Sequence, residues 1–377
     1  MMMIPLQRLP GPSAVSRTTF LGTLVLFVLM MALGVSACTG SVQTEALDAR
    51  VPELLRVLAP EDPAFFGIRG ASFNGSSLAV LTSPGPAIFL FTPRGLRTWG
   101  RKGNGPSELQ NPADVTWVDD HVLVWDFRLG KITSYDTMGD LVATRPYGFL
   151  SVARLAQTAG DTLLGLFSFS GGPGAVVRMA GSAIDTIVRL PAAAEQITLT
   201  APGSPSLRLR PPYTPSATWT GLTDGRVAYW DGRSSAISVL GLNGQVLGRL
   251  DLPRKRYLVL KEHRDAWLEE AIPRGDLAGR RDVFKALRAG VREEISFPAE
   301  FPWALGLIGD PRGGAWVQRT PATTGQVWTY VDGRGPRITL RFPAGREVLA
   351  VSVTEIAVKA QDALGVESVE IYVNPAP

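Results

Sequence analysis

Few residue types in this chain can carry out covalent or acid–base chemistry. The 377 residues include one cysteine, Cys38, and two histidines, His121 and His263. A single cysteine excludes an internal disulfide framework and any Cys-x-x-Cys metal site. His121 begins an expected strand after a turn, and His263 stands among the charged residues of an expected helix. Both imidazoles are therefore expected to face solvent rather than bind a metal or act as a base.

Sequence motifs disfavour several classes of enzyme. The chain has no Gly-x-Ser-x-Gly elbow, no Walker A loop, no His-Glu-x-x-His pair and no EF-hand spacing. The Gly103-x-Gly105 pair lacks the third glycine and the strand-to-helix context of a dinucleotide-binding loop. We therefore expect no cofactor, and the sequence favours a binding role over catalysis.

The N-terminal residues predict export. Residues 1–19 contain two arginines and no acid, and residues 20–35 form a 16-residue apolar run. That run is shorter than the ~20 residues a membrane-spanning helix needs, and the layout is that of a secretory signal peptide. The alternatives are an ordinary signal peptide with a chance cysteine and an N-terminal membrane anchor.

The residues that end this run point to lipid attachment. Residues 35–38 (Val-Ser-Ala-Cys) resemble the lipobox of bacterial lipoprotein signal peptides. The resemblance implies that residues 1–37 are removed and that Cys38 is acylated, which would also explain a lone cysteine in an exported protein. It implies a lipid-anchored protein of the bacterial envelope, in the outer membrane and facing the periplasm, whose contact with the membrane is Cys38.

Charge argues against a nucleic-acid partner. Removing residues 1–37 lowers the net charge from +4 to +2, because they contain two arginines and no acid. A nearly neutral mature chain lacks the basic excess that nucleic acid binding requires. Residues 38–52 are short and polar and are expected to form a tether.

From about residue 53 the sequence predicts an all-β fold of repeated four-stranded units. The 40 glycines and 29 prolines indicate many turns. One turn between the first two strands of a unit and another between its last two predict a meander of about 40 residues, the size of a propeller blade. Turn residues separated by 19–21 positions recur in five pairs: Gly75 and Gly95, Asp120 and Gly139, Gly160 and Gly181, Gly225 and Gly244, and Gly313 and Gly333.

One of these units resembles a known repeat. Residues 101–115 (RKGNGPSELQNPADV), followed by a strand that ends in Trp125-Asp126, resemble the NHL-type repeat. The chain as a whole is similar to the six-bladed β-propeller lipoproteins of bacterial envelopes, best over residues 100–145. That resemblance implies a six-bladed β-propeller of four-stranded antiparallel blades. Most of the family has no assigned activity.

Two insertions and the chain ends complete the predicted domain, residues 53–377. Residues 191–216 are rich in proline and serine and predict a long loop, and residues 253–300 have helical periodicity and predict short helices against the propeller. After the fifth unit only three strands remain before the C-terminus. We expect residues 54–58 to supply the missing strand, so that the N-terminal strand closes the last blade.

Tryptophans are expected mainly in the core. Trp125, Trp230 and Trp316 occupy like positions in second strands, where a bulky side chain packs between adjacent blades. For the other six, stacking on a sugar or peptide is the alternative to core packing: Trp99, Trp117, Trp219, Trp267, Trp303 and Trp328.

A basic face is the candidate binding surface. The loops that join each outer strand to the next inner strand, and each second strand to the third, lie on one face of a propeller and here carry an excess of basic residues. The opposite hairpin turns carry an excess of acids, although aspartate is also favoured there by turn geometry. The candidate ligand-binding residues are Arg101, Lys102, Arg128, Lys131, Arg233 and Arg319.

Three functions stay open at this stage. The first is a lipid-anchored, non-catalytic binding or scaffold module for a protein, peptide or glycan partner. The second is a propeller hydrolase or lyase with a carboxylate and metal site, for which Asp114 is the chief acid near the inner strands. The third is a structural subunit of an envelope complex.

We predict that Cys38→Ser abolishes acylation and releases the protein from the membrane, because serine has no thiol to receive the lipid. Metabolic labelling with a fatty-acid analogue and membrane fractionation check this. Thr39→Ser, which leaves Cys38 in place, is the matched control. Labelling of the Cys38→Ser protein at the normal level would contradict the lipobox assignment.

Overall fold

A computed structural model describes residues 49–62, 65–83, 85, 87–147, 152–158, 163–167, 174–180, 183–191, 197–199, 207–271 and 295–377. These residues belong to one compact unit, Leu47–Pro377. The predicted signal peptide, Cys38 and most of the predicted tether lie outside the described residues. Within the described ranges, no helix has the length and apolar character needed to cross a membrane.

Antiparallel meanders make up most of the described chain, as six four-stranded sheets. The first three are β2 (Ile68–Asn74), β3 (Ser77–Thr82), β4 (Ala87–Thr92) and β5 (Gly95–Trp99); β6 (Pro112–Val118), β7 (His121–Asp126), β8 (Lys131–Tyr135) and β9 (Leu141–Pro146); and β10 (Val152–Gln157), β11 (Leu163–Phe167), β12 (Ala175–Ala180) and β13 (Ala183–Arg189). The next two are β16 (Thr218–Gly221), β17 (Val227–Trp230), β18 (Ala236–Leu240) and β19 (Val246–Asp251); and β20 (Gly306–Gly309), β21 (Ala315–Gln318), β22 (Val327–Asp332) and β23 (Gly335–Arg341).

The remaining sheet joins the two ends of the described chain. Its order is β24 (Arg346–Val351), β25 (Glu355–Gln361), β26 (Glu367–Val373) and β1 (Leu54–Leu58). Strand β1 pairs antiparallel with β26, with Leu58 opposite Val369. Arg56 on β1 also forms a two-bonded ion pair with Glu355, at 2.6 and 3.0 Å. The predicted completion of the last blade by the N-terminal strand is confirmed.

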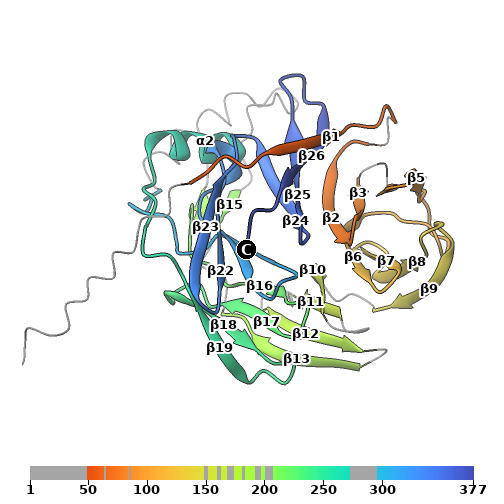
Figure 1. The fold of residues 1–377 in the computed structure, drawn as a ribbon, viewed down its shortest axis with the longest axis horizontal. Coiled ribbons are helices and arrows are strands. Elements are labelled where there is room, and N and C mark those ends of the chain that lie inside the picture. Colours follow the sequence, from red (N-terminus) through yellow and green to blue (C-terminus); the bar gives the residue numbers. More distant parts are fainter. Residues whose placement is uncertain are drawn as a thin grey trace, which may run out of the picture. The chain divides into compact units, whose positions relative to one another are not determined.

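The first strand of each sheet lies innermost, around a common axis (Figure 1). Strands β2, β6, β10, β16, β20 and β24 contact one another in that order, and β24 contacts β2. The fold is therefore a β-propeller of four-stranded antiparallel blades, as the sequence predicts.

Apolar clusters between neighbouring blades form the core. Trp125 on β7 packs against Leu155 and Val177 of the next blade, and Trp316 on β21 packs against Val358 of the last blade. Trp230 on β17 lies in the cluster shared with β20 and β21. These three indoles are at most 1% exposed, which confirms their predicted position.

Three of the tryptophans left open also belong to the core. Trp117, Trp219 and Trp328 are 1–3% exposed and lie in clusters between blades. Core packing therefore accounts for them, and stacking on a ligand does not. Trp99 and Trp303 are half-buried and pack against the same kind of cluster.

The two predicted insertions differ from expectation in detail. Residues 191–216 contain two short paired strands, β14 (Ile197–Leu199) and β15 (Leu207–Leu209), where a long loop was predicted. Residues 253–300 contain helix α2 (Lys261–Ala271), which contacts the short 3-10 helix η1 (Ala322–Thr324) between β21 and β22. The helix packs against the propeller as predicted, and the second predicted helical face, near residues 283–291, lies outside the described residues.

His263 on α2 corrects a prediction. It is buried, and its Nδ1 accepts a hydrogen bond from the Leu260 backbone N–H at 2.9 Å. The ring stands edge-on to Phe301 with centroids 4.9 Å apart, and burial lowers the pKa of His263. This imidazole caps the start of the helix instead of facing solvent.

A comparison of Trp230 with Trp125 provides a test of the core between blades. Trp230 Nε1 donates to the Ser234 carbonyl at 2.7 Å, whereas the buried Trp125 Nε1 has no hydrogen-bond partner. We predict that Trp230→Phe lowers the free energy of unfolding by ~1 kcal/mol more than Trp125→Phe, because only the first substitution removes a hydrogen bond. Denaturant unfolding of both variants measures the difference. Equal losses would contradict this assignment.

Candidate binding site on the propeller axis

The antiparallel order of each blade places two kinds of loop on one face. The loop that enters an inner strand and the loop between the second and third strands lie at the same end of the blade. We call this end the entrance face. It carries the segment before β6, the loop before β8 and the loop that contains η1.

A cavity of about 670 Å³ opens between the inner strands on the entrance face. The beginnings of β2, β6, β20 and β24 line it, together with Tyr213 and with Glu270 of α2. A narrower cavity of about 190 Å³ is lined by residues further along the same inner strands, including Thr116, Gln157 and Thr220. Asp114 and Arg154 line both cavities, so they mark the boundary between the wide and narrow parts of the axis.

Asp114 on β6 connects two blades. Its Oδ2 accepts the backbone N–H of Leu155 on β10 at 2.6 Å, and its Oδ1 accepts the N–H of Val115 at 2.9 Å. A Cβ atom at Gly70 on β2 would lie 3.1 Å from Oδ1, so glycine leaves room for the carboxylate. Burial raises the pKa of Asp114 to about 6, against the effect of these hydrogen bonds and of the Arg154 charge.

Arg154 on β10 is the cation of the axis. Its Nη1 donates to the Trp219 carbonyl of β16 at 3.1 Å. The other N–H groups of this guanidinium have no hydrogen-bond acceptor among the described residues. Burial lowers the pKa of Arg154, and the Asp114 charge opposes that shift. A guanidinium offers five N–H donors, so Arg154 retains donors for a ligand that enters either cavity.

The mouth of the wide cavity carries charges of both signs. Arg69, Glu270 and Glu347 line it and are exposed. Arg154 lies deeper in the cavity than these rim residues. Its N–H donors are available there to an anionic or hydrogen-bond-accepting group of a ligand.

Four of the six predicted basic residues are exposed on the entrance face: Arg101, Lys102, Arg128 and Arg233. Arg101 forms an ion pair with Glu108 at 2.9 Å. The other two, Lys131 and Arg319, are buried, which corrects their predicted exposure.

Lys131 holds the loop of residues 101–111 in place. Its Nζ donates to the carbonyls of Gly105 and Pro106 at 2.8 and 3.0 Å. The Glu108 carboxylate accepts the Gly105 N–H at 2.8 Å, and a Cβ at Gly103 would lie only 1.9 Å from that carboxylate. Lys131 and Glu108 thus hold the loop onto its own blade through hydrogen bonds to its backbone.

Arg319 is 1% exposed at the end of β21. Its Nη2 donates to the Lys255 carbonyl at 2.7 Å, and its guanidinium lies 5.7 Å from the Tyr257 ring centroid. Burial lowers the pKa of Arg319 to about 10. The side chain holds the helical insertion against the propeller and does not reach the basic face.

On the face opposite the entrance, several acids predicted to form an acidic surface are paired with arginines. Asp224 pairs with Arg226, and Glu355 pairs with Arg56. The prediction of an acidic face did not include these two arginines. The charge difference between this face and the entrance face is therefore smaller than predicted.

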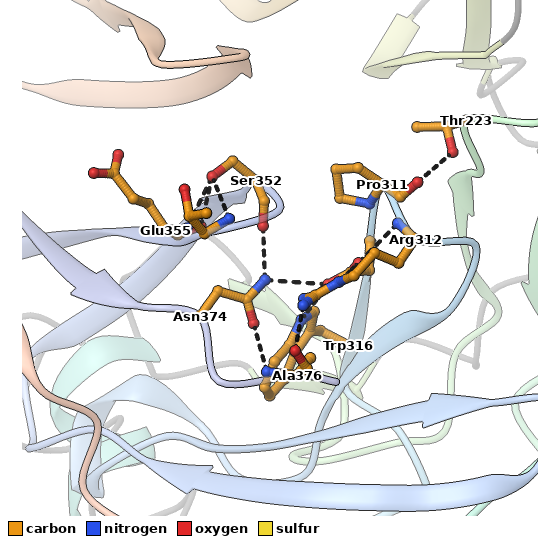
Figure 2. A network of polar contacts seen from close by, with 10 residues as sticks. Thr223, Pro311, Arg312, Trp316, Ser352, Glu355, Asn374 and Ala376 are labelled. Carbon is orange, nitrogen blue, oxygen red and sulfur yellow. Dashed lines mark hydrogen bonds and ion pairs between the residues drawn. The ribbon is translucent and has the colours of Figure 1, made fainter.

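Asp310, in the hairpin between β20 and β21, is another acid expected on that face and is buried in a polar network, whose partners Arg312, Trp316 and Asn374 are labelled in Figure 2. Arg312 donates to both of its oxygens at 2.8 Å, and Trp316 Nε1 donates at 3.0 Å. Asn374 bridges Asp310 and the Ser352 carbonyl, which ties the C-terminal segment to the hairpins of two blades. These hydrogen bonds outweigh burial and hold the pKa of Asp310 below its usual value.

Metal ligands are not clustered in the described part of the chain. No group of three or more His, Cys, Asp or Glu side chains is placed there to hold an ion. His121, expected to face solvent, is half-buried at the start of β7.

Arg154 was not among the residues predicted from the sequence. Among residues expected in inner strands, the sequence prediction rested on acids as metal ligands and not on the single arginine of residues 152–157. An arginine within a predicted innermost strand is a signal that could have identified it, because a charged side chain there can face only the axis or a neighbouring blade.

Comparison with known proteins supports the fold. No protein-family model matches the sequence, and no curated protein matches it. A solved structure from Bacteroides vulgatus, a member of the DUF4221 family, superposes with a TM-score of 0.51 at 10% identity, covering 85% of this chain and 97% of that one. At that identity the similarity shows the fold alone.

Two other solved structures superpose less well, with TM-scores below 0.5. A putative exported protein from Bacteroides fragilis is 12% identical, with a TM-score of 0.48 and coverage of 89% of this chain and 98% of that one. Virginiamycin B lyase from Staphylococcus aureus is 9% identical, with a TM-score of 0.44 and coverage of 85% and 99%. The class that the fold defines is the β-propeller.

The raised pKa of Asp114 predicts a specific pH dependence of stability. Its pKa is about 6 in the folded protein against 3.8 for the free side chain, so the folded state binds the proton more tightly. The stabilisation from this group is complete below pH ~4 and is lost as the pH rises through ~6. The difference between these two pKa values corresponds to at most ~3 kcal/mol.

Asp114→Asn removes that titration. The stability of the original protein relative to this variant should therefore fall between pH 4 and pH 7. Denaturant unfolding at several pH values measures the difference, and Asp120→Asn, in an exposed turn, is the control. A difference that stays constant with pH would contradict the raised pKa.

Proposed function

We propose that this protein is a lipid-anchored, six-bladed β-propeller of the bacterial envelope that binds a protein, peptide or glycan partner without catalysis of its own. In this proposal residues 1–37 are a signal peptide, Cys38 carries the lipid, and the propeller faces the periplasm from the outer membrane. The lipobox-like residues 35–38 support the anchor. The order of contacts among the inner strands supports the blade number.

The observation that carries the binding role is the wide cavity with Arg154 at its inner end. A cavity of about 670 Å³ is large enough for a small ligand or for one side chain or sugar unit of a larger partner. The exposed residues Arg101, Lys102, Arg128 and Arg233 lie in loops of two blades on the same face as the cavity. A partner with acidic or hydrogen-bond-accepting groups would contact these residues at the rim and Arg154 at depth.

A binding role fits Asp114 better than a catalytic one. Each of its oxygens already accepts a backbone N–H, one of them from the neighbouring blade. These two hydrogen bonds fix the carboxylate between β6 and β10. Asp114 is therefore assigned to holding the inner strands together, and Arg154 to the ligand.

Arg154→Gln tests this function. We expect it to weaken binding of a partner captured from the envelope by at least ~tenfold, because a hydrogen bond from a charged donor is worth ~1.5–3 kcal/mol. Crosslinking in cells identifies the partner, and the affinity is then measured with the purified mature protein. The combined change of Arg101, Lys102, Arg128 and Arg233 to Gln should slow association and make it less sensitive to salt.

The matched control is Arg94→Gln with Arg334→Gln. Both side chains are exposed, and both lie in turns between third and fourth strands, away from the entrance face. The binding role would be contradicted if Arg154→Gln and the fourfold variant bound the partner as tightly as this control. Turnover of a substrate by the purified protein would favour the hydrolase or lyase alternative.

A further inference from the structure

The first described residues contact the outer edge of the propeller at strand β23. The Arg50 backbone N–H donates to the Thr339 carbonyl at 2.9 Å, and the Arg341 N–H donates to the Arg50 carbonyl at 2.8 Å. Arg50 is thus held against β23, the outermost strand of its blade. It stands 12 positions after Cys38.

This spacing limits how far the rim can lie from a membrane. A fully extended chain advances at most ~3.6 Å per residue, so 12 positions span no more than ~43 Å. If Cys38 is acylated, as proposed above, the rim around Arg50 always stays within that distance of the lipid.

Unpaired cations gather at this same rim. Lys255 Nζ lies 5.7 Å from the ring centroid of Tyr257, and Arg341 is close enough to Tyr257 for its charge to oppose the rise in the tyrosine pKa that burial causes. We define the basic rim as Arg50, Arg254, Lys255 and Arg341. All four are exposed, and none forms an ion pair with a carboxylate of the described residues.

Exposed aliphatic side chains accompany these cations. Val51 is 72% exposed and Leu258 is 59% exposed, and each is adjacent in sequence to the basic rim or its tyrosine. Arg50 bridges to Leu340 on β23, and the charge of Arg341, at the end of β23, acts on Tyr257, so both segments lie beside the outer strand of one blade. Cations with exposed aliphatic neighbours match the chemistry of a bilayer surface, where anionic headgroups overlie acyl chains.

We propose that the basic rim docks on the anionic phospholipid headgroups of the membrane that holds the lipid anchor, with Val51 and Leu258 among the headgroups. The inference rests on the proposed acylation of Cys38. It adds an orientation: the propeller stands with the outer edge of β23 toward the membrane. Both ends of its axis, including the wide cavity, then remain open to partners in the aqueous phase.

The test uses the mature acylated protein in vesicles of phosphatidylethanolamine and phosphatidylglycerol, with vesicles of phosphatidylcholine for comparison. A fluorophore is attached at Leu258→Cys, and quenching by lipids with a nitroxide headgroup reports its proximity to the membrane. The matched site is Val142→Cys, which is also exposed but lies on β9, an outer strand of another blade. Mass spectrometry first establishes the acyl group on Cys38.

We expect severalfold stronger quenching at Leu258→Cys than at Val142→Cys in the anionic vesicles, and a weaker contrast in phosphatidylcholine. Adding Lys255→Gln with Arg341→Gln, or raising the salt concentration, should remove most of the contrast, because exposed charges are screened over ~8–10 Å. Arg94→Gln with Arg145→Gln removes the same charge from exposed positions on other blades and should leave the contrast unchanged.

Each other outcome counts against the proposal in a distinct way. Equal quenching at the two sites on the acylated protein would overturn the membrane-facing rim and leave the anchor intact. Absence of the acyl group would overturn both the proposed anchor and the orientation drawn from it. Quenching that does not change in the Lys255→Gln and Arg341→Gln variant would contradict docking of the basic rim on headgroups. If, in addition, an acidic protein copurified with the original protein but not with this variant, the basic rim would be assigned to binding that protein.

Discussion

The burial of apolar blade faces against neighbouring blades is the interaction on which the rest of this structure depends. A single four-stranded sheet has two faces and cannot cover either by itself. Here each hydrophobic cluster of the described residues is shared by two adjacent sheets, and the cluster of Phe65 and Phe89 with Ile371 joins the first sheet to the last. The pairing of β1 with β26 holds that junction, because β1 completes the last sheet and the chain then continues into β2 of the first sheet.

Arranging sheets around an axis creates a second constraint at the inner strands. Each of these strands has one edge without a strand partner, and its backbone groups still need hydrogen bonds. Side chains of neighbouring blades meet part of that need: Asp114 accepts the Leu155 N–H, and Thr220 Oγ1 accepts the Gly309 N–H at 2.9 Å. These polar groups on the axis are thereby committed to structure. Arg154 retains donors that no described residue accepts, which makes the axis a candidate binding site.

Much of the architecture could be predicted because turn residues recur with a regular spacing. The paired turns of the blades containing Asp120 and Gly225 predicted the four-stranded units, and Trp125, Trp230 and Trp316 were recognised by their like positions within those units. The closing strand followed from the strand left over before the first unit. Solvent exposure of charged residues was predicted less well. Lys131, Arg319 and His263 were each expected at the surface, and each is buried with hydrogen bonds to backbone groups.

The sequence by itself therefore determined the class of fold, the size of its units and the position of the candidate lipid attachment at Cys38. These features depend on local pattern: alternation along strands, turn chemistry and the apolar run before the cysteine. Only the tertiary structure decided which charges are free to meet a ligand. Long basic side chains can reach carbonyl groups of loops that are remote in sequence, as Lys131 reaches Gly105 and Arg319 reaches Lys255. Whether such a side chain is exposed or buried depends on contacts between distant segments, and these exist only once the blades are packed around the axis.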